Sequence, residues 1–150
     1  MPKNFKFSSC PKHLLSKNTE KCNESIRENK LDQAISFLTE LKKGFGDDES
    51  VQEKIAQFMF RIILKDKTKR NLNLLNYIFN KAEKNLFNTE LCIPVLGILL
   101  LLNTKTEDKV INEIFKRMIN LDKKGLNKMI KKLPKSCQEK VKKVVNNGSN

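Results

Sequence analysis

The amino-acid sequence predicts an all-α protein, and three observations lead to this fold class. Apolar residues recur at steps of three and four over most of the chain, which is the spacing of an amphipathic helix. The 150 residues include only five Gly and four Pro, too few for the many turns of a sandwich or barrel. Hydrophobic residues make up 39% of the chain, enough to bury a core. We expect a single domain of about six to seven antiparallel helices, arranged as an α-solenoid or a helical bundle.

The N-terminal residues 1–18 are polar and basic and show no sustained period, so we expect a flexible arm there. The helical domain is predicted over residues 19–146, followed by a disordered tail at 147–150. The arm has no continuous apolar stretch, which predicts no secretion signal. We therefore expect reduced cysteines and a nuclear or cytoplasmic location.

The first well-patterned helices lie between residues 31 and 63. The first has an apolar stripe formed by Leu31, Ala34, Ile35, Leu38 and Leu41. Gly44 and Gly46 are expected to end it, and the run Asp47–Ser50 supplies a cap and first-turn acids for the next helix. That second helix has a wider apolar face, formed by Val51, Ile55, Phe58, Met59, Ile62 and Ile63.

A basic break at 65–70 precedes a third helix over 72–82. Asn88 and Thr89 can cap a fourth helix, which covers the most apolar run, 91–102. Pro94 predicts a kink or a late start in this helix. Because the run has twelve residues and a membrane span needs roughly 20, we expect a helix buried on all sides.

Three more helices are predicted in the C-terminal third. Thr106–Asp108 opens a fifth helix that continues to Leu121. After Gly125 a short helix ends at Pro134, and Ser136 can cap a last one through residue 145.

An internal repeat is visible when the sequence is shifted by 31 residues. The shift pairs Val95 with Leu126, Ile98 with Met129, Leu99 with Ile130, Leu102 with Leu133, Val110 with Val141 and Ile114 with Val145. A third copy over residues 34–55 matches if two residues are added to the turn. Helix pairs of this size cannot bury their own faces and must stack.

The best copy, Ile93–Ile114, has an apolar helix, an acidic turn at Glu107 and Asp108, and Val110 opening a second helix. In this order it resembles the HEAT and Armadillo class of helical repeats, over about residues 31–146. The Arg that often follows the Val in that family is replaced by Ile111. The resemblance implies a binding scaffold, and an ordinary helical bundle is the alternative.

The charge of the chain is strongly positive and concentrated at one end. Thirty Lys and Arg against 17 Asp and Glu give a net charge of +13. Residues 123–150 contain nine Lys against Glu139 alone, so this segment contributes +8. Such an excess attracts polyanions, although the abundant Lys could also reflect an A/T-rich genome. Lys suits contacts with the phosphate backbone better than it suits base reading.

The predicted surface for nucleic acid or an acidic partner consists of Lys124, Lys128, Lys131, Lys132, Lys135, Lys140, Lys142 and Lys143. Four of these, at 124, 128, 131 and 135, share one side if the helix continues. No aromatic residue lies among them, so base stacking is not expected. A solvated cap of the helix stack, or a nuclear-import signal, would give the same pattern.

Residue patterns for catalysis or metal binding are weak. The single histidine, His13, has only Cys10 and Cys22 as neighbouring candidate ligands, too few for a structural zinc site. No phosphate-binding glycine loop occurs, and the acidic clusters lie at predicted helix starts. We therefore predict no enzyme, no metal, no cofactor and no small-molecule substrate.

These patterns favour a non-catalytic helical binding module within a larger assembly. It would contact nucleic acid, with RNA preferred over DNA, or an acidic partner through its C-terminal lysines. The alternative is a protein–protein adaptor that holds a partner helix or peptide in an apolar groove, which would require an exposed apolar patch. A protein partner is expected in either case, and a membrane partner is not.

Overall fold

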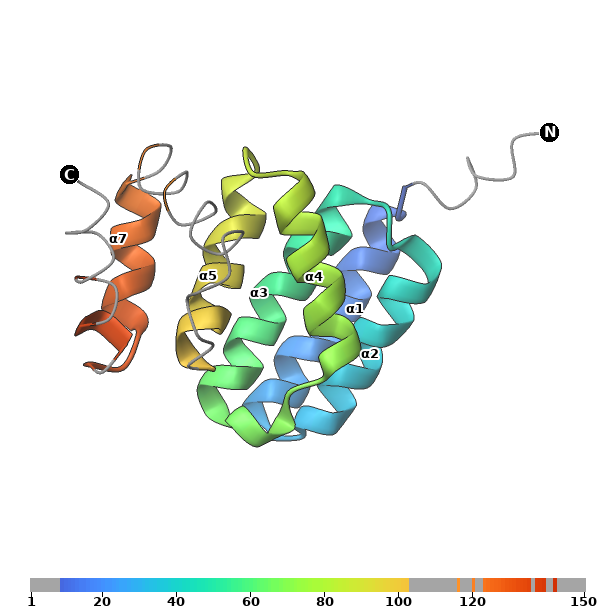
Figure 1. Ribbon diagram of the computed structural model, residues 1–150. Coiled ribbons are helices and arrows are strands. Elements are labelled where there is room, and N and C mark those ends of the chain that lie inside the picture. Colours follow the sequence, from blue (N-terminus) through green and yellow to red (C-terminus); the bar gives the residue numbers. More distant parts are fainter. Residues whose placement is uncertain are drawn as a thin grey trace. The chain divides into compact units, whose positions relative to one another are not determined.

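The computed structural model describes residues 9–102, 116, 120, 123–135, 137–139 and 142, and all regular structure in these residues is helical. Six α-helices and one short 3-10 helix, η2, follow one another along this part of the chain (Figure 1). The predicted all-α fold class is therefore confirmed. The helices pack against one another in a way that is compatible with a helical repeat.

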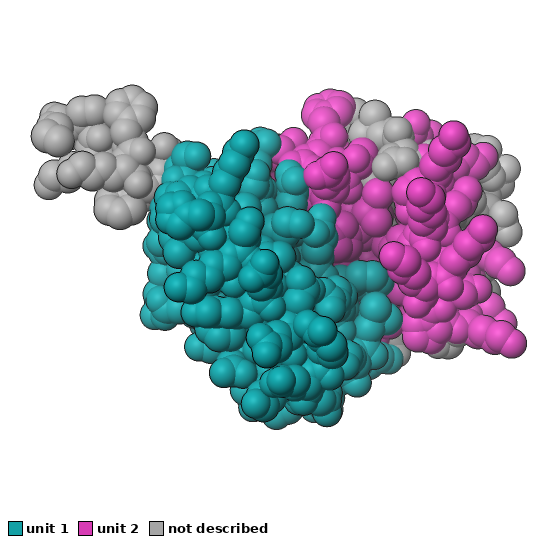
Figure 2. Space-filling model, turned by 180° about the vertical axis from the view of Figure 1, so that it is seen from behind, with its two compact units in different colours: residues 1–78 teal, residues 79–150 magenta. Residues whose placement is uncertain are grey.

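Contacts within the chain form two compact units, residues 1–78 and 79–150, which Figure 2 colours teal and magenta. The boundary falls inside α4 (Leu72–Lys84), so one helix contributes residues to both units. No interdomain linker separates the units, in agreement with the predicted single domain.

The first helix, α1 (Lys12–Arg27), begins inside the stretch that the sequence predicted as an arm. The prediction of an arm is therefore wrong for residues 12–18. Its buried side chains, Cys22, Ser25 and Ile26, all lie in the second half of the helix. The first half contributes only two half-buried leucines, Leu14 and Leu15, which are too few to make a visible period.

A left-handed residue ends α1 and fixes the start of the next helix. Asn29 has a φ of 62°, and its backbone N–H donates to the Ile26 carbonyl at 3.0 Å. The N–H of Lys30 donates to the Ser25 carbonyl at 2.7 Å. These are the two bonds of a Schellman motif, and Asn tolerates its left-handed position better than most residues. The chain therefore reverses at once into α2.

Helices α2 (Leu31–Phe45) and α3 (Glu49–Lys65) complete the packing of α1, since each of the three contacts the other two. Fully buried side chains from α2 and α3, among them Leu38, Ile55 and Met59, form the core of unit 1. Asp48 caps α3 as predicted, because its Oδ1 accepts from the Ser50 N–H at 2.8 Å. The stripe predicted for α3 is buried throughout, and that predicted for α2 is buried except for Ile35, which is half-buried.

The turn between α2 and α3 is held by hydrogen bonds to one carbonyl. The Tyr77 hydroxyl of α4 donates to the Gly46 carbonyl at 2.7 Å, and Gln52 Nε2 donates to the same oxygen at 3.1 Å. A Cβ at position 46 would lie 2.7 Å from the Lys42 carbonyl oxygen. Glycine is therefore required here by close backbone approach. Gly44, predicted to end α2 as well, lies inside its last turn.

The predicted basic break contains η2 (Lys67–Lys69), and α4 follows it. Asn71 starts α4, since its Oδ1 accepts from the Leu74 N–H at 3.0 Å. Leu74, Leu75 and Ile78 bury the part of α4 that belongs to unit 1.

In unit 2, α5 (Thr89–Leu101) is buried almost throughout. Asn88 caps it as predicted, with Oδ1 accepting from the Leu91 N–H at 3.1 Å. Pro94 lies inside the helix, so the late start that it could have caused does not occur. None of the helices in the described ranges is long and apolar enough to cross a membrane.

The last described helix, α7 (Lys123–Lys132), packs against α5 within unit 2. It ends two residues before Pro134, as the sequence predicted, but it begins at Lys123, so the prediction that it starts after Gly125 is wrong. The helix predicted from Thr106 to Leu121 and the cap at Ser136 lie outside the described residues, apart from single positions. So do residues 1–8 of the predicted arm and the predicted tail, 147–150.

Candidate polyanion-binding surface

One face of α7 is anchored in unit 2 by apolar side chains. Leu126 and Met129 are buried on this face, and Leu133 is buried just beyond the end of the helix. The segment that follows is tied back to α5, because Cys137 Sγ donates to the Leu100 carbonyl at 3.6 Å. These contacts fix which side of α7 is turned away from the protein.

The outward side of α7 has a row of lysines. We define the lysine row as Lys124, Lys128 and Lys131, all of which are exposed. At 100° per residue, these three positions fall within about 60° of one another on the helix, opposite Leu126 and Met129. The predicted one-sided arrangement of these lysines is therefore present in α7.

The other predicted site residues are distributed more widely. Lys132 is exposed in α7 but lies about 80° around the helix from Lys124. Lys135 and Lys142 are exposed beyond the end of α7, while Lys140 and Lys143 lie outside the described residues. The structure also exposes Lys123 in the first turn of α7, which the sequence analysis counted as charge but did not assign to the surface.

The lysines of α7 have no compensating negative charge within the helix. Its first turn contains no acidic residue, and its ten residues include no carboxylate. No ion pair joins a lysine of α7 to any residue in the described ranges. The carbonyl end of the helix favours Lys131 and Lys132, which offers a structural reason for two of the five cations. Lys123, Lys124 and Lys128 lie too early in the helix for that reason to apply.

The weak metal candidates of the sequence do not assemble into a site. Cys10 Sγ donates to the Pro11 carbonyl, Cys22 Sγ donates to the Ala34 carbonyl, and His13 is exposed on α1. No group of three potential metal ligands occurs in the part of the chain that the structure describes. Burial raises the pKa of the Cys22 thiol to about 12, against a smaller opposing effect of the Arg61 charge. This thiol is therefore protonated and unreactive at neutral pH.

The acidic cluster before α3 has a structural role. Asp48 uses Oδ1 for the cap of α3 and accepts the Cys10 N–H with Oδ2 at 2.6 Å. Asp48 therefore holds the start of α1 beside the start of α3. The second cluster, Glu107 and Asp108, lies outside the described residues.

Two open depressions in unit 1 are lined mainly by polar groups. One, of about 400 Å³, is lined by Lys21, Glu24, Glu28, Lys30 and Phe37, together with Ser25 and Gln33. The other, of about 460 Å³, lies over the α2–α3 turn at Lys42, Lys43 and Asp47. Neither lining contains a His or a Cys, so neither places a nucleophile beside an imidazole base.

Comparison with models of known protein families, with curated proteins and with solved structures found no match to this chain.

Proposed function

We propose that this chain is a non-catalytic helical binding module that contacts the phosphate backbone of nucleic acid, RNA above all, within a larger nuclear or cytoplasmic assembly. The observation that carries the proposal is the lysine row, an exposed set of cations opposite the buried face of α7 that forms no ion pair with the residues the structure describes. A rigid helix that presents cations on one side can follow a polyanion without ordering its own backbone first.

The chemistry of the row favours contacts with phosphate over contacts with bases. Each lysine is a point charge with three rotatable donors, which suits phosphate oxygens and does not read a base edge bidentately. Residues 123–150 contain no aromatic residue on which a base could stack. Binding should therefore be strong in low salt and indifferent to sequence.

We further propose that the helices belong to the HEAT and Armadillo class of repeats. The support is the 31-residue echo, which equates α5 with α7, together with the packing of these two helices against each other. In a stack of repeats each helix keeps an outer face that is available to a ligand, and the exposed lysines of α7 would lie on such a face.

The test is binding of the full chain to a labelled uridine oligonucleotide over a range of salt concentrations. Replacing Lys124, Lys128 and Lys131 by Gln should weaken binding and reduce the slope of log K against log salt by about 2, since each lost contact with single-stranded phosphate removes about 0.7. Far-UV circular dichroism should be unchanged, because the three side chains are exposed.

A matched control removes the same charge elsewhere. Lys12, Lys17 and Lys43 are exposed in unit 1 and belong to no proposed surface, so their replacement by Gln should leave the slope nearly unchanged. Equal slopes for both triple variants would mean that net charge, not the lysine row, attracts the oligonucleotide. Binding to polyglutamate but not to RNA would instead indicate an acidic protein partner.

The adaptor function has less support. It would need a continuous exposed apolar surface. Among the described residues the exposed large apolar side chains are Leu64, Leu72 and Phe87, the first two in unit 1 and the third in unit 2. Apolar side chains that are exposed singly in this way are normal for a soluble surface.

A further inference from the structure

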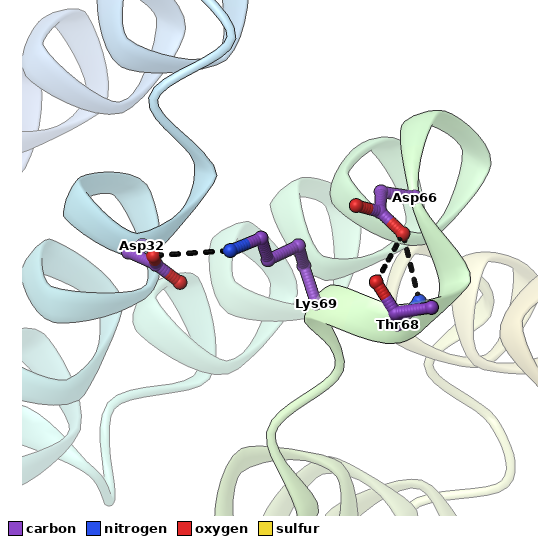
Figure 3. Close-up of polar contacts among 4 residues, drawn as sticks. All are labelled: Asp32, Asp66, Thr68 and Lys69. Atoms are coloured by element: carbon purple, nitrogen blue, oxygen red, sulfur yellow. Dashed lines mark hydrogen bonds and ion pairs between the residues drawn. The ribbon is translucent and has the colours of Figure 1, made fainter.

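A second basic surface lies at one end of unit 1, where four helices and η2 meet. Lys65 Nζ, near the end of α3, donates to the Ile26 carbonyl near the end of α1 at 2.8 Å. Lys69 Nζ of η2 pairs with Asp32 Oδ2 in the first turn of α2 at 3.2 Å (Figure 3). Figure 1 shows the ends of α1 and α3 and the starts of α2 and α4 on the same side of unit 1. We call residues 27–32 and 65–70 the basic end.

The basic end contains six cations and three acids. The cations are Arg27, Lys30, Lys65, Lys67, Lys69 and Arg70, and the acids are Glu28, Asp32 and Asp66. Two of the acids are paired with cations of the same end, Glu28 with Lys30 at 3.2 Å and Asp32 with Lys69 at 3.2 Å. The chain therefore neutralises part of this charge locally and leaves the rest.

The third acid, Asp66, serves the fold of the turn. Its Oδ1 accepts from the Thr68 N–H at 2.9 Å and from the Thr68 hydroxyl at 2.6 Å (Figure 3). These two hydrogen bonds lower the pKa of the Asp66 carboxyl. Asp66 thus caps η2, the short helix that contains Lys67 and directly precedes Arg70.

Four cations of the basic end are exposed and have no ion-pair partner in the described ranges: Arg27, Lys65, Lys67 and Arg70. Lys65 is held by its hydrogen bond to the Ile26 carbonyl, which leaves Arg27, Lys67 and Arg70. Two of these are arginines, although the whole chain has only four. The guanidinium group is the side chain best suited to bidentate contact with phosphate. An acid partner could have balanced these three as it balances Lys30 and Lys69, but none of the described residues does so.

We propose that Arg27, Lys67 and Arg70 form a second contact surface for the phosphate backbone of single-stranded nucleic acid, separate from the lysine row. The inference rests on the nucleic-acid binding proposed above, but not on α7 being its surface. A single strand is flexible, so it can contact cations in both units without requiring one fixed geometry between them. Two separate sets of contacts on one strand raise affinity by effective concentration.

The experiment uses the full chain and the same uridine oligonucleotide. Replacing Arg27, Lys67 and Arg70 by Gln should reduce the slope of log K against log salt by about 2, at about 0.7 per lost phosphate contact. The variant keeps both ion pairs and the Asp66 cap, so its circular dichroism and unfolding midpoint should match the wild type. Combined with the triple variant in the lysine row, the slope should fall by about 4.

The outcomes separate this inference from the proposed function. A slope reduced only by the lysine-row variant would overturn the second surface and leave α7 as the binding surface. If only the basic-end variant reduced the slope, the lysine row would lose its role and the second surface would stand. An equal reduction in the Lys12, Lys17 and Lys43 control would overturn both surfaces, as would a wild-type chain that does not bind the oligonucleotide.

Anionic vesicles distinguish the remaining partner class. Leu64 and Leu72 are exposed on either side of the basic turn, an arrangement that a membrane surface could also use. The assay is co-sedimentation with phosphatidylserine vesicles, for the wild type and for a Leu64→Ser, Leu72→Ser variant. If the wild type bound vesicles but not RNA, and the variant did not bind vesicles, the ligand of the basic end would be lipid and not nucleic acid.

Discussion

Helices α5 and α7 are related by the 31-residue echo, yet they differ sharply on one face. At the shared inward positions both helices bury apolar side chains, Ile98 in α5 and Met129 in α7. At five other positions the 31-residue shift aligns a lysine of α7 with an apolar residue of α5. The aligned pairs are Lys123 with Cys92, Lys124 with Ile93, Lys128 with Gly97, Lys131 with Leu100 and Lys132 with Leu101. Four of these five counterparts are buried, whereas all five lysines are exposed.

The difference shows what each face of a packed helix responds to. The residues on the inward face are determined by the core that they fill, so α5 and α7 both have apolar residues there. The outer face is set by its neighbour. In α5 that neighbour is protein, and in α7 it is solvent. The outer face of α7 is therefore free to carry charge.

The largest expected effect comes from exchanging the outer residues of the two helices. Leu100→Lys places an unpaired charge at a position that is 5% exposed, and we expect a loss of more than about 4 kcal/mol in the free energy of unfolding. The reciprocal Lys131→Leu should change it by no more than about 0.5 kcal/mol. Urea unfolding followed by circular dichroism measures both. Similar values for the two variants would remove the contrast between the helices.

Truncation at the shared inward positions should affect the two helices alike. Ile98→Ala and Met129→Ala each remove a buried side chain, and each should cost about 2–5 kcal/mol. The same unfolding assay applies, with Lys128→Ala as an exposed control in α7. If Met129→Ala were as mild as the control, this face of α7 would not pack against the rest of unit 2.

A smaller effect depends on pH. Burial raises the pKa of the Cys92 thiol in α5 from 9.0 to about 11. Between these two pH values the folded chain retains a proton that the unfolded chain loses, so the free energy of unfolding decreases as pH rises. The decrease from this group is at most about 1.4 kcal/mol per pH unit, and below pH 9 the group has no effect.

The matched variants for this pH effect again lie on α5 and α7. Above pH 9, Cys92→Ala should make the decrease of the free energy of unfolding with pH less steep, because the buried thiol is gone. Lys131→Cys adds a thiol at an exposed position and should not make that decrease steeper. Cys22 contributes equally to both variants and cancels in the comparison. An identical slope in the wild type and in Cys92→Ala would show that this thiol titrates normally in the folded chain.

The smallest effect concerns the cap of α5. Asn88→Ala removes the acceptor for the Leu91 N–H and should cost about 1 kcal/mol, while Asn88→Ser should retain most of the stability. Thermal unfolding of both variants measures the difference. Equal losses would mean that the side-chain oxygen does not stabilise this helix start.

Most helix positions could be predicted because their signals are local. The stripe from Leu31 to Leu41 and the caps Asp48 and Asn88 are all encoded within a few residues of the elements they define. The first half of α1 could not be predicted, because it buries no side chain and therefore has no apolar stripe. The hydrogen bond that ties down the start of α1, from the Cys10 N–H to Asp48 Oδ2, joins residues that are 38 apart in the sequence, and a local pattern cannot reveal it.

The candidate surfaces were only partly predictable. Lysine spacing located the row on α7, since Lys124, Lys128 and Lys131 share a side in any helix. The basic end depends on contacts between distant residues, such as Lys65 with Ile26 and Lys69 with Asp32, which no local pattern reveals. The sequence showed a basic break at 65–70 but not which of its cations were paired.

The two echoes in the repeat pattern relate helices in different ways. The echo between α5 and α7 joins two helices that pack against each other. The echo between α2 and α5 spans two intervening α-helices, α3 and α4. In a stack of helix pairs, equivalent helices are separated by an odd number of intervening helices. Because two helices separate α2 from α5, this second echo does not fit a regular stack of pairs. Apolar stripes alone could not reveal that difference, because any amphipathic helix resembles another.

The hydrogen bond from Tyr77 to the Gly46 carbonyl has a practical consequence. The chain has one tyrosine and no tryptophan. Fluorescence at wavelengths longer than the emission of phenylalanine therefore comes from Tyr77 alone. Burial, with a smaller effect of the charges on Asp47 and Asp48, raises the pKa of the Tyr77 hydroxyl. Its emission and its alkaline titration thus provide an intrinsic optical reporter of one tertiary contact, between the α2–α3 turn and α4. A loss of that signal before the loss of helical dichroism would show directly that this turn opens first.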